Sequence, residues 1–258
     1  MDNIKQIRSF YIAKCLKIRY HELKVFYTYS RKHFTFKLIK KYKYEVILKM
    51  IKTRNRLLAD KVIKGLESRN MCGYYAETKE EALQKALELI PEGSSIGWGG
   101  SVSVSEIGLR DAVINGNYTI FNRDICTTPE EKREMELKIF GCDYFLCSTN
   151  AMTEDGILVN IDGNSNRVAA IAYGPKNVVM IVGMNKIAKD VDSALSRARN
   201  FAAPANAQRF PLNTPCKING SCADCKSRDT ICCEFLVTRY SRHANRFHII
   251  LVNEALGF

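Results

Sequence analysis

The chain has 258 residues, 46% of them hydrophobic, with a formal net charge of +12 and a mean hydropathy of -0.19. This length and composition suffice for a sizeable buried core and indicate a soluble, globular protein. No apolar run approaches the roughly 18 to 20 residues that cross a bilayer, and the basic N-terminus lacks the apolar stretch and cleavage site of a secretory signal. We therefore expect a globular, cytoplasmic protein with no membrane span.

The positive charge is concentrated at the N-terminal end. Residues 1–49 contain 13 Lys and Arg against 3 Asp and Glu, a net charge of +10, whereas residues 50–258 contain 26 against 24, a net charge of +2. Only the first segment could supply an electrostatic surface for nucleic acid. We interpret it as a basic, aromatic extension outside the core and do not expect nucleic acid as a partner; an arm that binds nucleic acid or a membrane surface is the alternative. Met50, where a regular domain sequence begins, is an alternative start of translation.

Helix and strand patterns alternate from residue 52 onward. Three helix starts carry local signals: the capping boxes Thr78 with Glu81 and Ser103 with Glu106, and the pair Thr128-Pro129. In the first half of the chain we expect helices over 52–68, 78–89 and 103–114 and from 128 onward, and strands over 72–76, 94–98 and 118–121.

The second half of the chain is richer in strand patterns. We expect strands over 143–148, 157–161, 168–173, 178–182 and 247–253, and a helix over 190–201. Strand 178–182 is apolar enough to lie centrally in a sheet. The turns Asp162-Gly163 and Gly174-Pro175 separate three of these strands, which predicts a meander joined to a parallel sheet. The alternation as a whole predicts an α/β fold with three layers, α/β/α.

A glycine-rich passage follows the predicted strand 94–98 and precedes a predicted helix. Small residues in this position allow backbone N–H groups to meet an anion at a helix N-terminus, where the helix dipole favours negative charge by about 0.3–1 kcal/mol. The alternative is a tight turn between a strand and a helix. The residues that we expect to bind an anion here are Gly97, Gly99, Gly100, Ser101 and Ser103.

Cysteines gather in the segment 214–233, with the spacing Cys216-x5-Cys222-x2-Cys225-x6-Cys232-Cys233. Four thiolates carried on turns match the loop geometry of a zinc or iron–sulfur site. We expect Cys216, Cys222, Cys225 and Cys232 to be metal ligands, with Cys233 as a substitute ligand or a free thiol. Regulatory thiols and ordinary packing are the alternatives. A disulfide scaffold is not expected, because such scaffolds belong to small secreted domains.

Two common catalytic arrangements are missing from the sequence. No Gly-Lys-Ser or Gly-Lys-Thr follows the glycine-rich passage, so there is no Walker A motif. The four histidines form no pair at ligand spacing, and no Ser-His-Asp order is recoverable. The sequence therefore disfavours nucleotide hydrolysis and serine-hydrolase chemistry.

Several motifs in residues 50–258 have an order and spacing that resemble the LUD, or lactate-utilisation, domain family. They are the passage from Pro91 to Ser101, the turn Thr153-Glu154-Asp155-Gly156, the polar run from Asp162 to Arg167, Tyr173-Gly174-Pro175 and the cysteine-rich segment 214–233. The resemblance implies the Rossmann-like, three-layer fold shared by ribose-5-phosphate isomerases, glucosamine-6-phosphate deaminases and coenzyme A transferases. It also implies a role in the oxidation of lactate and other organic acids, and it leaves the reaction open.

The same resemblance suggests roles for polar residues in the second half of the chain. Glu154 and Asp155 occupy the place where the related isomerases and transferases carry catalytic acids, which implies a general base or an acyl-transfer nucleophile. A simple Asp-Gly turn is the alternative. Asp162 and Asn164 pose the same choice between ligand binding and a turn. Arg167 offers a planar donor fork suited to a carboxylate or phosphate.

These observations lead to one main expectation and one alternative. We expect a protein that binds a small anionic metabolite, or its phosphorylated or coenzyme A conjugate, in support of lactate or organic-acid metabolism. The alternative is a non-catalytic accessory subunit of an iron–sulfur oxidoreductase, whose other subunits would then be partners. The sequence does not decide whether the protein is an enzyme.

Overall fold

The computed structural model describes residues 33–258, with side chains from residue 45 onward. The chain divides into two compact units, residues 1–53 and residues 54–258. Helix α3 (His33–Ser68) begins in the first unit and ends in the second, at the residue where the sequence predicts its end. Most of the predicted extension, residues 1–49, lies outside the described side chains, so its contacts with nucleic acid or membranes stay a prediction.

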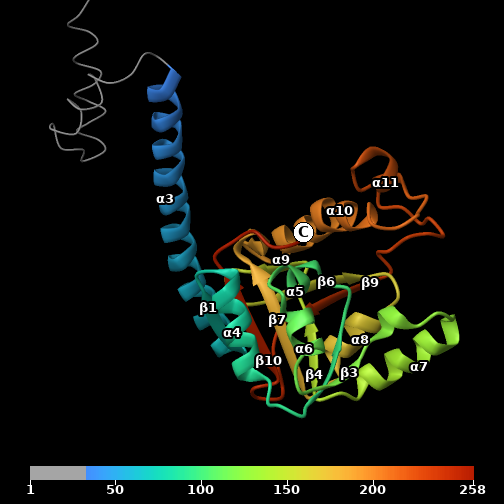
Figure 1. Ribbon diagram of the computed structural model, residues 1–258. Helices are drawn as coiled ribbons and strands as arrows, with labels where there is room; N and C mark the ends of the chain where they lie inside the picture. The colour runs from blue at the N-terminus through green and yellow to red at the C-terminus, as the bar shows by residue number, and fades with distance from the viewer. Residues whose placement is uncertain (1–32) are drawn as a thin grey trace, which may run out of the picture. The chain divides into compact units, whose positions relative to one another are not determined.

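A six-stranded sheet with all its strands parallel forms the centre of the second unit (Figure 1). Its strands are β1 (Cys72–Ala76), β2 (Ser95–Trp98), β3 (Thr119–Phe121), β4 (Tyr144–Cys147), β7 (Asn177–Gly183) and β10 (Phe247–Val252). Their order across the sheet is β1-β10-β7-β4-β2-β3. All six coincide with predicted strands to within two residues at each end, and the predicted α/β class is confirmed.

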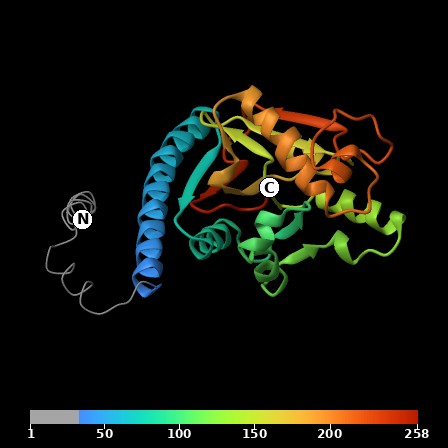
Figure 2. The same ribbon diagram turned by 90° about the horizontal axis from the view of Figure 1, so that it is seen from above.

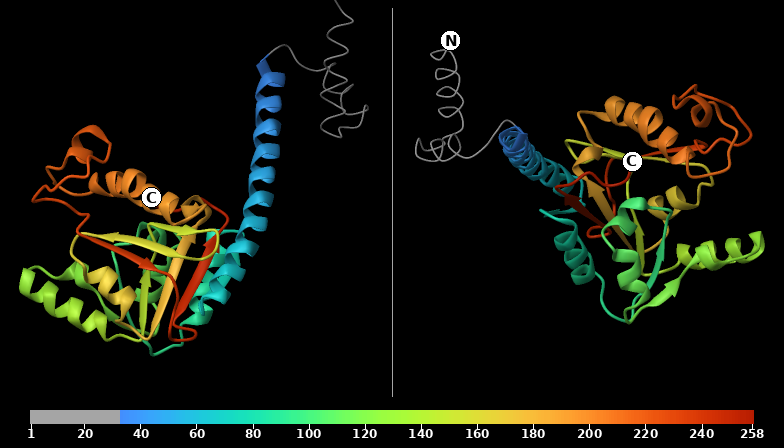
Figure 3. Two further views of the ribbon diagram at one scale, coloured as in Figure 1. Left: turned by 180° about the vertical axis from the view of Figure 1, so that it is seen from behind. Right: turned by 45° about the horizontal axis from the view of Figure 1, so that its top comes forward.

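Helices cover both faces of this sheet. The central strand β7 is accordingly apolar on both sides. Val178, Met180 and Val182 pack into one layer, whereas Val179 and Ile181 pack into the other. The first layer contains the end of α3, α7 (Pro129–Phe140) and α8 (Asn166–Ala172), and the left view of Figure 3 is taken from its side. The second layer contains α4 (Lys79–Leu89), α5 (Val102–Glu106) and α6 (Leu109–Ile114).

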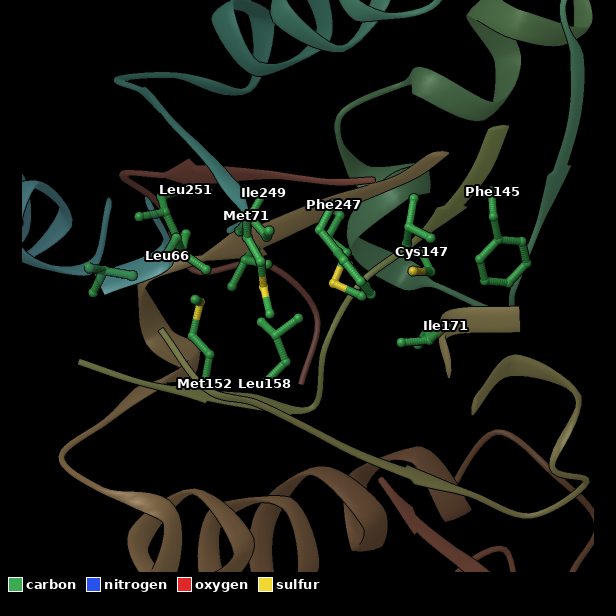
Figure 4. Packing of buried hydrophobic residues seen from close by; sticks show 14 of the residues in the cluster. Leu66, Met71, Phe145, Cys147, Met152, Leu158, Ile171, Phe247, Ile249 and Leu251 are labelled. Atoms are coloured by element: carbon green, nitrogen blue, oxygen red, sulfur yellow. The ribbon is translucent and has the colours of Figure 1, made fainter. Parts of the chain in front are cut away.

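A second, four-stranded sheet packs against the first layer, and the sequence predicted only one of its four strands, over 157–161. Its order is β8-β5-β6-β9. The strands are β5 (Ala151–Thr153), β6 (Leu158–Asp162), β8 (Ile187–Ala188) and β9 (Glu234–Thr238). Met152 and Leu158 reach from this sheet into the main core beside Leu66 and Leu251 (Figure 4). Its other side is covered by α9 (Val191–Arg197), a π-helical turn (Ala198–Ala202) and α10 (Ala203–Ala207).

Two predicted helix starts are present. At α7 the hydroxyl of Thr128 accepts the N–H of Glu131 at 3.1 Å, and the carboxylate of Glu131 accepts the N–H of Thr128 at 3.2 Å, so the capping box is complete. At α4 the hydroxyl of Thr78 accepts the N–H of Glu81 at 3.2 Å. Here the carboxylate of Glu81 accepts from Glu77 rather than from Thr78, so only half of the predicted box forms.

The strand predicted over 168–173 is wrong, because these residues belong to α8. A short apolar run cannot be assigned by periodicity alone, and its three alanines favour a helix. The guanidinium of Arg246 donates to the carbonyl oxygens of Ala170 and Ile171, at 2.9 and 2.6 Å, and holds the end of the helix from 75 residues away. Local sequence does not reveal such a cap. The predicted meander is therefore wrong as well.

The helix predicted over 103–114 is divided in two. Ser101, not Ser103, caps α5, since its hydroxyl accepts a backbone N–H at 3.4 Å. The helix ends after five residues, and Gly108, with φ of +75°, precedes α6. The carboxylate of Glu106 accepts the N–H of Gly257 at 2.8 Å instead of that of Ser103. A contact from the other end of the chain thus replaces the predicted capping box.

Candidate functional site

The carboxyl ends of β2, β4 and β7 define the candidate site. The chain runs from β2 outward to β3 and then returns to β4 on the opposite side of β2. Such a reversal of strand order is where open α/β sheets bind their ligands. The segments that leave the sheet at this edge are the glycine-rich loop after β2, residues 148–150 after β4, and the 3₁₀ turn Met184–Lys186 after β7.

Lys186 is the central charged group at this edge, and its side chain is buried, with 4% of the residue exposed. Its Nζ donates to the hydroxyl of Ser103 and to the hydroxyl of Ser148, both at 3.0 Å. Ser148 in turn donates to the carbonyl oxygen of Ile181 at 2.6 Å. An ammonium group has three donors. One N–H of Lys186 therefore lacks a hydrogen-bond partner among the described residues.

Burial lowers the pKa of Lys186 to about 7, and the positive charges of Arg197 and Arg167 act in the same direction. Glu106 opposes this shift. None of the ion pairs formed by the described side chains includes Lys186. Near neutral pH the amine and the ammonium form are thus both populated, which suits either anion binding or proton transfer.

The last residues of the chain cover Lys186. A Cβ built on Gly257 would lie 2.8 Å from Ser103 Oγ and 3.3 Å from Lys186 Nζ. The side-chain oxygen of Asn185 accepts the N–H of Leu256 at 3.1 Å and holds this segment in place. Figure 2 shows the end of the chain, marked C, between the green helices that follow β2 and the orange helices α9 and α10.

The residues of the glycine-rich loop have different surroundings. Gly97 lies inside β2, where an added Cβ would come within 2.7 Å of the side chain of Ile139, so its small size is explained by the packing of α7. A Cβ on Gly99 would lie 3.0 Å from Arg167 Cδ, whereas a Cβ on Gly100 would meet only Arg123, at 3.6 Å. Of these glycines, Gly100 therefore has the most open surroundings.

Arg167 supports the loop from the other side. Its guanidinium donates to the side-chain oxygens of Asn160 and Asn150, both at 3.0 Å, and to the carbonyl oxygen of Ser148 at 3.3 Å. A carboxylate oxygen of Asp162 lies 3.5 Å from its Nε. The donor fork is therefore largely occupied by protein groups. Nδ2 of Asn160 is buried without a hydrogen-bond partner among the described residues, which is unusual for a buried polar atom.

Asp162 and Asn164 form the turn before α8. One carboxylate oxygen of Asp162 accepts the N–H of Asn164 at 3.1 Å, and the other accepts the N–H of Val168 at 3.2 Å. These bonds are those of an Asx turn followed by a helix start. The structure thus gives Asp162 a defined role in the turn and in holding Arg167.

Glu154 and Asp155 lie in the turn between β5 and β6, in the second sheet. Glu154 pairs with Lys61 at 2.5 Å and with Lys189 at 3.0 Å, and hydrogen bonds from these two lysines lower its pKa. Asp155 pairs with Arg69, and a hydrogen bond from Thr153, more than the one from Arg69, lowers its pKa. The structure does not bring these carboxylates into contact with the glycine-rich loop or Lys186. Their partners lie in α3, in β5 and in the residues that directly follow α3 and β8.

The four cysteines predicted as metal ligands line one cavity of about 50 Å³. Cys216 is in α11 (Pro215–Asn219), Cys222 and Cys225 are in the loop that follows, and Cys232 precedes β9. All are free thiols, and burial, followed by the neighbouring cysteines, raises the pKa of Cys232 to about 11. Cys233 is exposed and does not line the cavity. Within the described residues, no group of three or more His, Cys, Asp or Glu side chains is placed so that it could hold a metal ion.

Lys186 and Ser148 are the candidate functional residues that sequence reasoning missed. The signal was present, because Lys186 follows β7, the longest buried strand, after only two residues. A polar residue directly after a buried parallel strand lies at the edge where α/β proteins bind ligands. Ser148 follows β4 in the same way.

A parallel sheet between two helical layers, with polar groups at its carboxyl edge, defines an α/β/α protein. The chain belongs to the LUD domain family, whose model matches residues 59–252, and this membership implies a role related to lactate utilisation. One similar solved structure is the crystal structure of a DUF162 family protein from Deinococcus radiodurans at 1.70 Å resolution. The two sequences are 11% identical, the match covers 77% of this chain and 98% of that chain, and the TM-score is 0.45.

The crystal structure of eIF2B delta from Chaetomium thermophilum shows a weaker likeness, with 14% identity, 55% coverage of this chain, 57% of that chain and a TM-score of 0.29. A comparison with curated proteins found no match. None of the described helices has the length and apolar character required to cross a membrane.

Proposed function

We propose that the protein binds a small anionic metabolite of lactate or organic-acid metabolism, or its phosphorylated or coenzyme A conjugate, at the carboxyl ends of β2, β4 and β7. The observation that carries this proposal is Lys186, a buried cation with no ion-pair partner among the described side chains and one N–H without a hydrogen-bond partner. A buried charge without a counter-ion is costly. A carboxylate or phosphate beside Lys186 would offset that cost.

The surrounding groups suit the same ligand class. Ser103 accepts a hydrogen bond from Lys186, and its own hydroxyl proton remains able to bind an anionic oxygen. The buried amide nitrogen of Asn160 offers a further donor, and the open side of Gly100 allows close approach to the backbone. Because α5 has only five residues, the proposal depends on these side chains and not on the dipole of that helix.

The ligand reaches Lys186 beside or in place of Gly257, since that residue covers the amine. A shift of residues 257–258 alone breaks few contacts: the N–H bond from Gly257 to Glu106 and the bond from the Asn185 side chain to the carbonyl oxygen of Gly257, while Leu256 stays buried in the core. Glu154 and Asp155 act, in this proposal, as ion-paired turn residues. No contact among the described residues favours an accessory subunit of an iron–sulfur oxidoreductase, so we do not propose it.

Calorimetric titration tests the proposal with L-lactate, pyruvate, phosphoenolpyruvate and acetyl-coenzyme A as probes. Lys186→Met should abolish binding of whichever probe the wild-type chain binds. Lys176→Met is the matched control, because Lys176 precedes the opposite end of β7 and its side chain is 84% exposed. A probe at 100 times its Kd should also stabilise the wild-type fold by about 2.7 kcal/mol.

Three outcomes would contradict the proposal. Full affinity in Lys186→Met would place the site elsewhere, and equal loss in both lysine variants would indicate a nonspecific charge effect. Failure of all four probes to bind the wild-type chain at concentrations up to about 10 mM would exclude a binding free energy beyond a few kcal/mol for this ligand class.

A further inference from the structure

The cavity between α11 and β9 brings together cysteines from three separate segments. Cys216 comes from α11, Cys222 and Cys225 come from the following loop, and Cys232 comes from the residue pair before β9. The hydroxyl of Thr214 lies 3.4 Å from the sulfur of Cys216. Four thiols of one small cavity form the donor set of a tetrahedral structural zinc site.

The structure distinguishes Cys232 from its neighbour Cys233. Cys232 lines the cavity and packs against the small apolar cluster under α9, whereas Cys233 is exposed, with its sulfur 3.7 Å from the carbonyl oxygen of Thr230. Two adjacent cysteines thus have the same sequence context but different positions. Successive side chains of an extended segment point to opposite sides, so of this pair only Cys232 is available as a ligand in the cavity.

The walls of the cavity supply no free positive charge. Arg199 is the cation that lines it, and Arg199 pairs with Asp224, which lines it too. Thiolates gathered here would therefore need a cation from solution. The loop 221–229, which carries Cys222 and Cys225, is part of a longer segment, 220–233, that contains neither helix nor strand. Segments of about this length without secondary structure are uncommon in compact domains and are usually either functional or linkers.

We propose that Cys216, Cys222, Cys225 and Cys232 bind one Zn²⁺ ion, which ties the loop 221–229 to α11 and β9. Coordination requires the sulfurs to move closer, and two of them are carried by the irregular loop. A volume of about 50 Å³ has room for a few atoms of the size of water, each of which needs roughly 10–15 Å³. A single ion fits this space.

Metal analysis of the full chain tests this proposal, and it is independent of the ligand site at Lys186. Protein purified in reducing buffer with added Zn²⁺ should contain one zinc per chain. Co²⁺ in place of Zn²⁺ should give the intense visible and near-ultraviolet absorption of tetrahedral thiolate coordination. Cys232→Ser and Cys222→Ser should each lower Co²⁺ affinity by at least tenfold, and Cys233→Ser, the matched control, should leave it unchanged.

Other results would overturn the assignment. Equal loss of Co²⁺ in Cys232→Ser and Cys233→Ser would show that the cavity does not select the ligands. Free titration of all five thiols of segment 214–233 in the presence of Zn²⁺ would show that no site exists. Brown protein with stoichiometric iron after anaerobic purification would show that these cysteines bind an iron–sulfur cluster and not a zinc ion. Far-ultraviolet circular dichroism separates loss of metal from loss of fold, because the main sheet contains none of these cysteines.

Discussion

The backbone N–H of Gly257 donates to the carboxylate of Glu106 at 2.8 Å, which joins the last residues of the chain to the short helix after β2. This bond places Gly257 against the hydroxyl of Ser103 and the amine of Lys186. Glu106, which the sequence suggested only as part of a capping box, thus holds the C-terminal residues that cover Lys186. Changes at Gly257 should therefore affect both stability and ligand binding.

Gly257→Ala should destabilise the fold more than Gly93→Ala. Both glycines have positive φ, +54° and +80°, so each alanine adds strain of about 1–2 kcal/mol. A Cβ at Gly93 meets nothing within 4 Å, whereas one at Gly257 would lie 2.8 Å from Ser103 Oγ. Urea denaturation measures the difference. Equal unfolding free energies for the two variants would show that the segment 256–258 does not pack on Ser103.

Lys186 should make the wild-type fold more stable as the pH rises. Its pKa is about 7 in the folded chain and about 10.5 when unfolded, so between these values the unfolded chain binds more protons. The free energy of unfolding then increases by up to about 1.4 kcal/mol for each pH unit in that window. Urea denaturation from about pH 6 to pH 9 should show this slope in the wild type and not in Lys186→Met.

Anion affinity should change in the opposite direction over the same window. The ammonium form of Lys186 attracts a carboxylate, and it is lost as the pH rises through about 7. The Kd of a bound probe should therefore increase toward about tenfold per pH unit above the pKa. An affinity that stays constant between pH 6 and pH 9 would show that the ligand does not depend on the Lys186 charge.

Gly99→Val and Gly100→Val should have separable effects. The side chain at position 99 would press on Arg167 Cδ, 3.0 Å from the Cβ position, and should lower stability by about 1–3 kcal/mol. At position 100 the nearest atom is 3.6 Å away, so the fold should be retained while ligand affinity falls. Thermal unfolding with and without ligand measures both. Retained ligand affinity in Gly100→Val would place the ligand away from the loop.

Glu154→Gln should leave ligand binding unchanged. The substitution keeps the size of the side chain and removes the charge that pairs with Lys61 and Lys189. Its affinity for a probe that the wild type binds should stay within about twofold, because the partners of Glu154 do not include the candidate site. Should turnover of a metabolite be found and depend on Glu154, an acid–base role for this turn would follow instead.

Local signals predicted those parts of the fold that local forces determine. The cap at Thr128 and the buried strand β7 are examples, since a capping box and an apolar run act over a few residues. The assignment failed at α8, whose end is held by Arg246 from 75 residues away. It also missed β5 and β8, with three and two residues, because strands so short leave no period to detect.

The candidate site shows the same division. The glycine-rich passage marked the end of β2, and the four cysteines that the sequence grouped line one cavity, whereas their role as metal ligands stays a prediction. The pairing of Lys186 with Ser103 and Ser148 joins residues 83 and 38 positions apart. Such a contact depends on the order of strands in the sheet. That order cannot be derived from the local patterns of a single sequence.

The place of β10 in the sheet constrains how the protein is made on the ribosome. β10 lies between β1 and β7, and its residues, 247–252, are synthesised long after both neighbours. A nascent chain that lacks them presents two unpaired apolar strand edges, which are sites of aggregation and of chaperone binding. The sheet can close only after residue 252 has left the exit tunnel, and Lys186 is covered only after Gly257 follows.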